Sequence, residues 1–289
     1  LRVLFFKLCK FLQSPITWIF VFDGPLRPNK KRSKSVNSQV PSWRGSCQSL
    51  LKSFGFAIHQ APGEGEAELA KLNASGFIDA VLSTDSDSFV FGAQCVIRRA
   101  KMNLRHDEFG IYHAHVIEHT ESVLLSTGGL LLLALVLGGD YSSGLEGCGV
   151  SVAHALAKSG FGDSLLEAAQ SLDDIGFELF RQKWISDLRN ELTTNTYGHL
   201  RARQPKLASN IPANFPERSI LELYCRPLTS FSPMQILPDI SSWKPREPKI
   251  KEITTFCYTH LGWRDISEIL GVFHRNLWEG VFLQMLYSV

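Results

Sequence analysis

Six carboxylates stand where the sequence predicts a strand or an apolar helix to end: Asp23, Glu64, Glu66, Asp85, Asp87 and Asp140. In an open parallel sheet the carboxyl ends of the strands meet at one edge, so we expect these acids to lie together there. Lys71 is the only basic residue between Glu64 and Asp87, so the acids lack matching positive charge. Divalent cations would supply it, and oxygen donors select Mg²⁺, Mn²⁺ or Ca²⁺ over zinc. Two such ions about 3.5–4 Å apart are the usual arrangement for phosphodiester chemistry.

Each acid has a plainer interpretation when it is taken alone. Glu64 and Glu66 would favour the start of a helix through the helix dipole, and Asp85 would cap a helix. The metal interpretation is favoured for the set, because converging carboxylates without cations repel one another.

The elements that must position these acids alternate between strands and helices. We expect strands over residues 16–22, 56–60, 78–82 and 94–98. We expect helices over residues 1–13, 43–54, 64–74, 122–138 and 150–159, and a helical pattern beyond residue 163. The run ITWIFVF at residues 16–22 is apolar without alternation, which is typical of a strand buried on both faces. The whole pattern predicts an α/β fold with a mostly parallel, twisted sheet flanked by helices.

Length and composition are those of an ordinary globular protein, with 289 residues, a net charge of +2 and 44% hydrophobic residues. They exclude wholesale disorder and collagen-like order. The six cysteines contain no C-x-x-C pair, which argues against a zinc ribbon or a dense disulfide framework and favours a reducing compartment. The longest apolar run, residues 129–137, is much shorter than the roughly 20 residues that span a bilayer. We therefore expect a buried helix there and no membrane partner.

Two further segments have the composition of phosphate contacts. Residues 144–149 (GLEGCG) form a glycine-rich turn before a predicted helix, where backbone N–H groups can approach a phosphate. The same pattern is also a common way to start a helix. Residues 24–63 contain no acid and seven basic residues, which suits a polyanionic substrate. Without the neighbouring motifs, a solvated basic loop would explain this segment equally well.

Four runs, taken together, resemble the structure-specific 5′ nucleases of the flap endonuclease/XPG family. They are FVFDGP at 20–25, APGEGEAELA at 61–70, STDSDSFVFG at 83–92 and GGDYSSGLEGCGVSVA at 138–153. Their order and spacing match the family over residues 20–162. The DGPLRP run, the GCGV turn and the GFGDSLLEA run at 160–168 are most similar to the GEN-type Holliday junction resolvases.

The resemblance implies a PIN/FEN-like nuclease core at 1–138 with a basic arch at 24–50, a helix-two-turn-helix module at 139–165 and a helical extension at 166–289. The positions that match the family's catalytic metal ligands are Asp23, Glu64, Glu66, Asp85, Asp87 and Asp140. Glu68 lies beyond the motif and is expected on the helix surface. The positions expected to contact DNA are Lys30, Arg32, Arg44, Gly144, Leu145, Gly147, Cys148 and Gly149.

The same resemblance implies a nuclear enzyme of DNA repair and recombination that cuts branched double-stranded DNA at 5′ flaps or four-way junctions. It implies two Mg²⁺ ions, replaceable by Mn²⁺, a K⁺ ion at the glycine hairpin, a dimer on a four-way junction and no small-molecule cofactor. Where the family often has a lysine after the hairpin, this chain has Ser151, so one phosphate contact is expected to be weaker.

One departure from the family favours an alternative. The family begins with a central strand that carries another metal-binding Asp, whereas residues 1–22 contain no Asp or Glu. We therefore expect the chain to start inside the nuclease domain, to leave an open edge beside the strand at 16–22 and to cleave DNA poorly by itself. The alternative is a protein that binds branched DNA without cutting it. An Asp-bearing strand encoded upstream would favour the enzyme.

Overall fold

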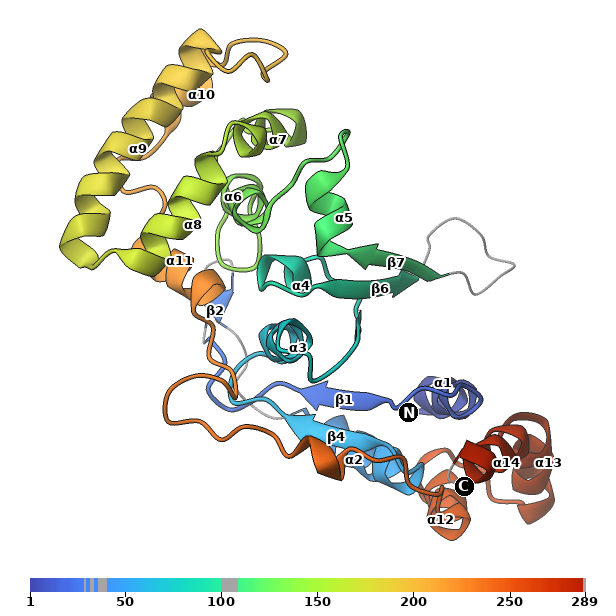
Figure 1. Cartoon of the computed structure of the whole chain (residues 1–289). Coiled ribbons are helices and arrows are strands. Elements are labelled where there is room, and N and C mark those ends of the chain that lie inside the picture. The colour runs from blue at the N-terminus through green and yellow to red at the C-terminus, as the bar shows by residue number, and fades with distance from the viewer. Residues whose placement is uncertain (29, 32–33, 36–40, 100–108, 288–289) are drawn as a thin grey trace. The chain divides into compact units, whose positions relative to one another are not determined.

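The computed structural model describes residues 1–28, 30–31, 34–35, 41–99 and 109–287. The chain divides into two compact units, whose helices and strands are labelled in Figure 1. Unit 1 comprises Leu1–Phe22, Ser38–Ala61 and Ile236–Val289, and unit 2 comprises Asp23–Asn37 and Pro62–Gln235. These divisions fall at places other than 138 and 165, and the domain boundaries expected from the sequence stay a prediction.

The strands form two parallel pairs, which agrees with the predicted α/β class. In unit 1, β1 (Ile19–Phe22) pairs parallel with β4 (Ala57–Gln60). In unit 2, β5 (Val81–Leu82) pairs parallel with β6 (Cys95–Arg99), which pairs antiparallel with β7 (Phe109–His113). A short antiparallel ladder joins β2 (Lys30–Lys31) to β3 (Lys34–Ser35). Among the described residues the ladders are three separate sheets instead of one.

Strand β1 differs from the expectation of complete burial. All four of its residues are half-buried. Within the described residues β4 is its one strand partner, so no second strand covers its other side. Phe20 still packs against Phe56 at 5.4 Å between ring centroids, which covers part of the strand with aromatic surface.

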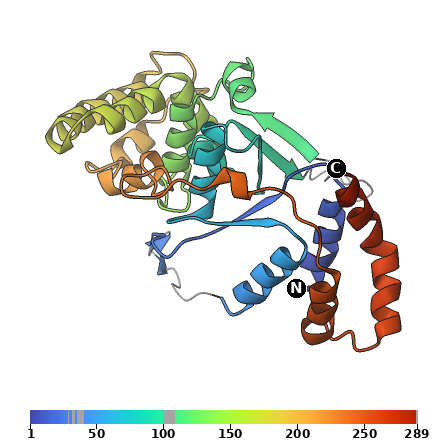
Figure 2. The ribbon, with the colours of Figure 1, turned by 60° about the horizontal axis from the view of Figure 1, so that its bottom comes forward.

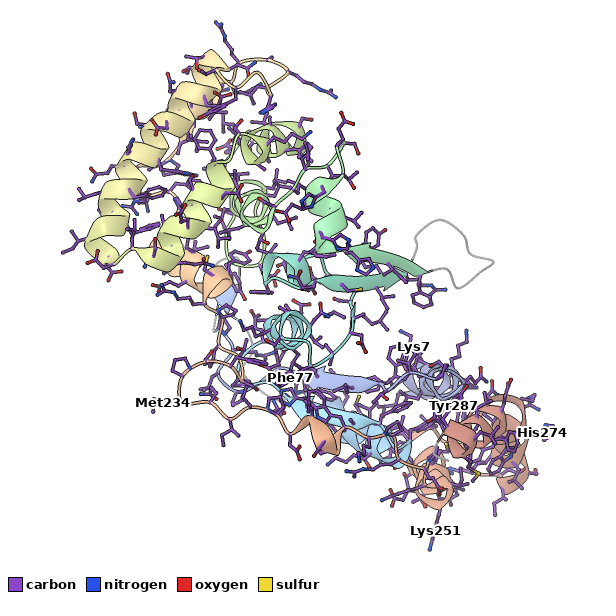
Figure 3. The ribbon with its side chains drawn as sticks, in the orientation of Figure 1. Lys7, Phe77, Met234, Lys251, His274 and Tyr287 are labelled. Atoms are coloured by element: carbon purple, nitrogen blue, oxygen red, sulfur yellow. The ribbon has the colours of Figure 1, made fainter. Side chains whose placement is uncertain are left out.

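The core of unit 1 joins the two ends of the chain. Its helices are α1 (Arg2–Leu12), α2 (Trp43–Ser53), α12 (Ile250–His260), α13 (Ile266–Asn276) and α14 (Trp278–Tyr287), with the short 3₁₀ helix η1 (Ile240–Ser242) before α12. Helix α1 lies beside α13 and α14, and α2 lies beside α12 (Figure 2). Phe5, Phe54 and Phe273 are buried at the centre. Lys251 and His274 point away from this core (Figure 3).

Unit 2 is built around an apolar helix, α6 (Thr127–Leu137), which the sequence predicted as buried. The other helices of unit 2 are α3 (Gly65–Ala74), α4 (Asp87–Val90), α5 (Ala114–His119), α7 (Val150–Lys158), α8 (Phe161–Ser171), α9 (Asp174–Thr194), α10 (Pro205–Asn210) and α11 (Arg218–Cys225). Helix α6 packs against α4, α7 and α8. Over the described residues no helix combines the length and the apolar character needed to cross a membrane.

Candidate functional site

Asp23 is joined to the start of helix α3. The Oδ1 atom of Asp23, directly after β1, accepts a hydrogen bond from the Gly65 N–H at 2.8 Å. The adjacent backbone supports this contact, because the Gly24 N–H donates to the Gly63 carbonyl at 2.6 Å. Glu64 is the buried N-cap residue of α3, and Glu66 stands in its first turn. Acids from two separate sequence motifs therefore meet where the helix dipole favours negative charge.

A cation from the same turn already contacts Asp23. The Arg27 Nη1 lies 3.2 Å from the Asp23 Oδ2, with 25% of the Arg27 side chain and 47% of the Asp23 side chain exposed. A pair this open to water contributes little to stability. Its importance is chemical, because one carboxylate oxygen of Asp23 faces a guanidinium. This pair was not among the expectations from the sequence, although opposite charges four residues apart are a signal for it.

Asp85 and Asp87 form a second local pair after β5. The Asp85 N–H donates to the Ser83 hydroxyl at 3.0 Å, and the Asp85 Oδ1 accepts from the Asp87 N–H at 3.0 Å. Asp85 therefore orders the turn that begins α4, although the N-cap residue of that helix is Ser86. The other carboxylate oxygen of Asp85, Oδ2, takes no part in this hydrogen bond from the Asp87 N–H.

Asp140 lies in the loop after α6, next to the core that holds α4. Tyr141 follows Asp140, and Phe91 follows α4 directly. Both rings contact Tyr224, with centroids 4.8 Å and 5.9 Å away. The loop of Asp140 and the end of helix α4 thus share one aromatic neighbour, Tyr224, while a common site for Asp140 and Asp87 stays a prediction.

The donors fit Mg²⁺ by type. Every predicted ligand is a carboxylate oxygen, and Mg²⁺ in proteins is usually held by one or two carboxylates with waters and substrate phosphates. In the part of the chain that the structure describes, no three His, Cys, Asp or Glu side chains are grouped so that they could hold a metal ion. The acids stand as local groups at neighbouring elements, and a single six-acid cluster stays a prediction.

Glu68 corrects one expectation. It is fully buried instead of lying on the helix surface. Its Oε2 accepts from the Ser230 N–H at 2.8 Å, which supplies the hydrogen bond that a buried carboxylate needs. The sequence held a signal for this, because Glu68 is four residues after Glu64 and so lies on the same side of α3.

The glycine hairpin has an anchored base and an open tip. Gly144 has φ +80°, and a Cβ there would lie 2.7 Å from the Gly138 nitrogen, so only glycine fits. Leu145 is buried, and its N–H donates to the Val136 carbonyl at 2.8 Å. Leu145 therefore anchors the base of the hairpin, and its DNA contact stays a prediction. Gly147 and Gly149 face open space. Between them, burial raises the pKa of the Cys148 thiol to about 11, so it is neutral at pH 7.

The structure describes the three basic residues predicted to contact DNA to different extents. Arg44 donates to the Gln60 Oε1 at 2.6 Å, and its guanidinium lies 5.1 Å from the centre of the Phe22 ring. It is thereby fixed at the carboxyl ends of β1 and β4. Lys30 belongs to β2, where the structure describes its backbone. Arg32 lies outside the described residues.

Part of the chain matches a known protein family. Residues 55–140 match the XPG I-region family, a span that contains all the predicted metal ligands except Asp23. The chain is therefore similar to the flap endonuclease/XPG nucleases, in agreement with the resemblance of its motifs.

Within this class the relatives include GEN proteins. The chain is 39% identical to "Flap endonuclease GEN-like 1" of Arabidopsis thaliana over 138 residues, which are 47% of this chain and 22% of that protein. It is 31% identical to "Flap endonuclease GEN homolog 1" of Homo sapiens over 188 residues, 58% of this chain and 20% of that protein. The chain thus spans about a fifth of the length of these relatives.

A solved structure shares the fold. The "eukaryotic junction-resolving enzyme GEN-1 binding with Sodium" superposes with a TM-score of 0.78 and 31% identity, covering 98% of this chain and 65% of that one. GEN1 "in complex with product DNA and Mg2+ ion" gives a TM-score of 0.75, with 31% identity over 98% of this chain and 64% of that one. The predicted fold class is confirmed.

Proposed function

We propose that this chain is the nuclease region of a Mg²⁺-dependent, structure-specific endonuclease that cuts branched DNA at 5′ flaps or four-way junctions. A role in DNA repair and recombination in the nucleus belongs to the same proposal. The observation that carries it is the hydrogen bond from the Gly65 N–H to Asp23 at 2.8 Å. This bond holds the acid after β1 against the start of the helix that bears Glu66, with Glu64 as its N-cap, which supports a shared site for the two sequence motifs.

The proposed metal ligands are Asp23, Glu64, Glu66, Asp85, Asp87 and Asp140. Bound Mg²⁺ ions would polarise the phosphodiester and make a water more acidic. The chain's own residues would supply the rest. The dipole of α3 and the Gly65 N–H orient the Asp23 carboxylate, and the Asp87 N–H orients that of Asp85.

The hairpin is the proposed contact for duplex DNA. Its exposed tip at Gly147 and Gly149 lets a phosphate approach backbone atoms, and such contacts position DNA without reading its sequence. Solved GEN-1 structures bind potassium, sodium or cesium, which supports a K⁺ site at the hairpin carbonyls as part of this proposal. A dimer on the four-way junction is proposed with it.

The test is cleavage of labelled flap and four-way junction DNA with Mg²⁺ and with EDTA. Asp85→Asn keeps an oxygen that can accept from the Asp87 N–H but removes the charge that would hold the metal. We expect it to lower cleavage at least about 100-fold, as losses of catalytic electrostatic groups do, with DNA affinity unchanged or slightly tighter. Glu121→Gln, at an exposed acid beyond the site, is the matched control. Normal cleavage by Asp85→Asn would exclude the catalytic assignment.

A second candidate function is binding of branched DNA without cleavage. Two observations favour it: Arg27 contacts Asp23, and no three potential ligands are grouped among the described residues. The same assay decides between the two functions. If the wild-type chain binds junction DNA and gives no Mg²⁺-dependent product, the binding function is the correct one.

A further inference from the structure

A cationic pocket lies in unit 2 on the side of α7. Its volume is about 440 Å³. It is lined by four segments: the turn before α6, α6 itself, one face of α7 and the turn after α9. The lining residues that carry the argument are Ser122, Ser151, His154, Lys158, His199 and Arg201.

The charge of the lining is entirely positive. Lys158 and Arg201 carry full charges, His154 and His199 can add to them, and no Asp or Glu lines the pocket. Within the described residues, no side-chain hydrogen bond or ion pair engages Lys158, His199 or Arg201. Uncompensated cations that face a shared cavity repel each other, so an anion there lowers the electrostatic energy.

The pocket also offers donors and a firm base. Ser122 and Ser151, two exposed residues with hydroxyl groups, line the pocket. His154 is fixed by a hydrogen bond between its Nε2 and the Val123 carbonyl. Leu125 and Leu133 form an apolar floor, next to which charge interactions are stronger than in open water. The N-cap Gly149 provides no side-chain cap, so the first N–H groups of α7 add to the positive potential.

The position of the pocket selects the ligand. Its α7 face begins at Val150 and Ser151, directly after the open hairpin tip at Gly149. A chain of phosphates that touches the hairpin can therefore continue along α7 to Lys158 and across to Arg201. The volume far exceeds what one small anion needs, and lysine, arginine, serine and helix N-termini are the usual partners of a DNA backbone.

We propose that this pocket binds phosphates of the same DNA duplex that the hairpin contacts, with Arg201 and Lys158 as the main charges. This inference rests on the proposed function, because it adds a contact for that substrate. It places one DNA contact outside the hairpin and outside the basic segment at 24–63, in the turn after α9.

The experiment measures the affinity of the full chain for a fluorescent four-way junction in EDTA, where cleavage cannot occur, by anisotropy at several salt concentrations. We expect Arg201→Ala and Lys158→Ala each to weaken binding about 3- to 10-fold near 100 mM salt and to reduce the salt slope of log K by about 1. Arg201→Lys should restore most of the affinity. Arg203→Ala, an exposed arginine two residues away that does not line the pocket, should change the affinity less than about twofold.

The outcomes separate this inference from the proposed function. If the wild-type chain binds no DNA, both are overturned. If it binds and cuts junctions while Arg201→Ala equals Arg203→Ala, the inference alone fails. Inorganic phosphate serves as a second probe: if it raises the melting temperature only when Arg201 is present, while DNA affinity does not depend on Arg201, the pocket is a small-anion site and the inference is wrong.

Discussion

At the scale of single residues, backbone N–H groups orient three of the acids. Asp23 accepts from Gly65, Asp85 from Asp87 and Glu68 from Ser230. A carboxylate that accepts such a bond keeps its orientation without a metal. Arg27 adds a second partner to Asp23 and occupies the side of the carboxylate that a cation would seek. This arrangement gives a testable competition between an internal cation and Mg²⁺.

The first prediction removes the internal cation. Arg27→Ala should lower the Mg²⁺ concentration for half-maximal binding several-fold, because the Asp23 carboxylate no longer faces a guanidinium at 3.2 Å. Isothermal titration with Mg²⁺ measures this midpoint. Lys71→Ala is the control. It also removes one positive charge, but Lys71 lies in the last turn of α3 and is not the partner of Asp23 in the ion pair. Equal midpoints for the two variants would show that the ion pair does not compete with the metal.

At the scale of elements, close contact between two helices positions the hairpin. Helices α6 and α8 meet at glycines. A Cβ at Gly162 would lie 2.1 Å from the Gly128 carbonyl oxygen, and a Cβ at Gly128 would lie 2.6 Å from the Asp163 Cα. Such distances fall below normal contact, so the helices approach this closely only because both positions are glycine. Helix α7 follows the hairpin and packs on the same pair.

The second prediction tests this contact. Gly162→Ala should lower the free energy of unfolding by about 1–3 kcal/mol, because the added methyl group has no room between backbones. Urea denaturation measures the change. Gly45→Ala is the control: Gly45 lies in α2 with nothing within 4 Å of a new Cβ, and we expect it to be neutral or stabilising by up to about 1 kcal/mol. A similar loss in both variants would contradict the steric explanation.

At the scale of the whole molecule, the two ends of the chain are interdependent. The core of unit 1 takes Phe5 from α1, Phe54 from the end of α2 and Phe273 from α13. Phe5 and Phe273 stack with centroids 6.1 Å apart and an interplanar angle of 19°. The helical C-terminal segment, to which the sequence assigned no chemistry, therefore has a structural role beside α1.

The third prediction measures that role. Phe5→Ala and Phe273→Ala should each cost about 3–5 kcal/mol of unfolding free energy, since each empties a fully buried site. The double variant should cost less than the sum, because the two rings share one contact. Phe282→Ala, 62% exposed on α14, should change stability by less than about 0.5 kcal/mol. Strict additivity in urea unfolding would show that the rings do not cooperate.

The fourth prediction concerns alkaline pH. Burial, with a smaller contribution from Cys257, raises the pKa of Cys9 to about 12, and burial raises that of Cys257 to about 12, from an ordinary value of 9.0. A thiol whose pKa is raised by folding favours the folded state fully below pH 9.0 and loses that effect as the pH rises toward 12. The melting temperature should fall over this range. The Cys9→Ala/Cys257→Ala variant should show a shallower fall, and parallel curves would rule the thiols out.

The sequence determined the elements and their chemistry. Helices α1, α2, α3 and α7 lie within one or two residues of the predicted bounds, because apolar periodicity and glycine ends are local signals. Strand β5 was predicted too long. The Asn73 side-chain amide donates to the Ile78 and Asp79 carbonyls at 3.0 Å, and these groups are thereby withdrawn from a ladder. No pattern within residues 78–82 predicts that the side chain of Asn73, in the preceding helix, binds these two carbonyls.

Only the tertiary structure decided which groups meet. The motifs identified the six acids, but the pairing of Asp23 with Gly65 and with Arg27 depends on how the turn after β1 passes the start of α3. Burial of Glu68 depends on Ser230, which is 162 residues away. Two other long-range contacts also depend on the tertiary structure. Lys158 and Arg201 line one pocket, and Phe5 stacks on Phe273. Local sequence fixes backbone preference and side-chain chemistry, whereas long-range contacts form only when the chain closes its loops around a shared core.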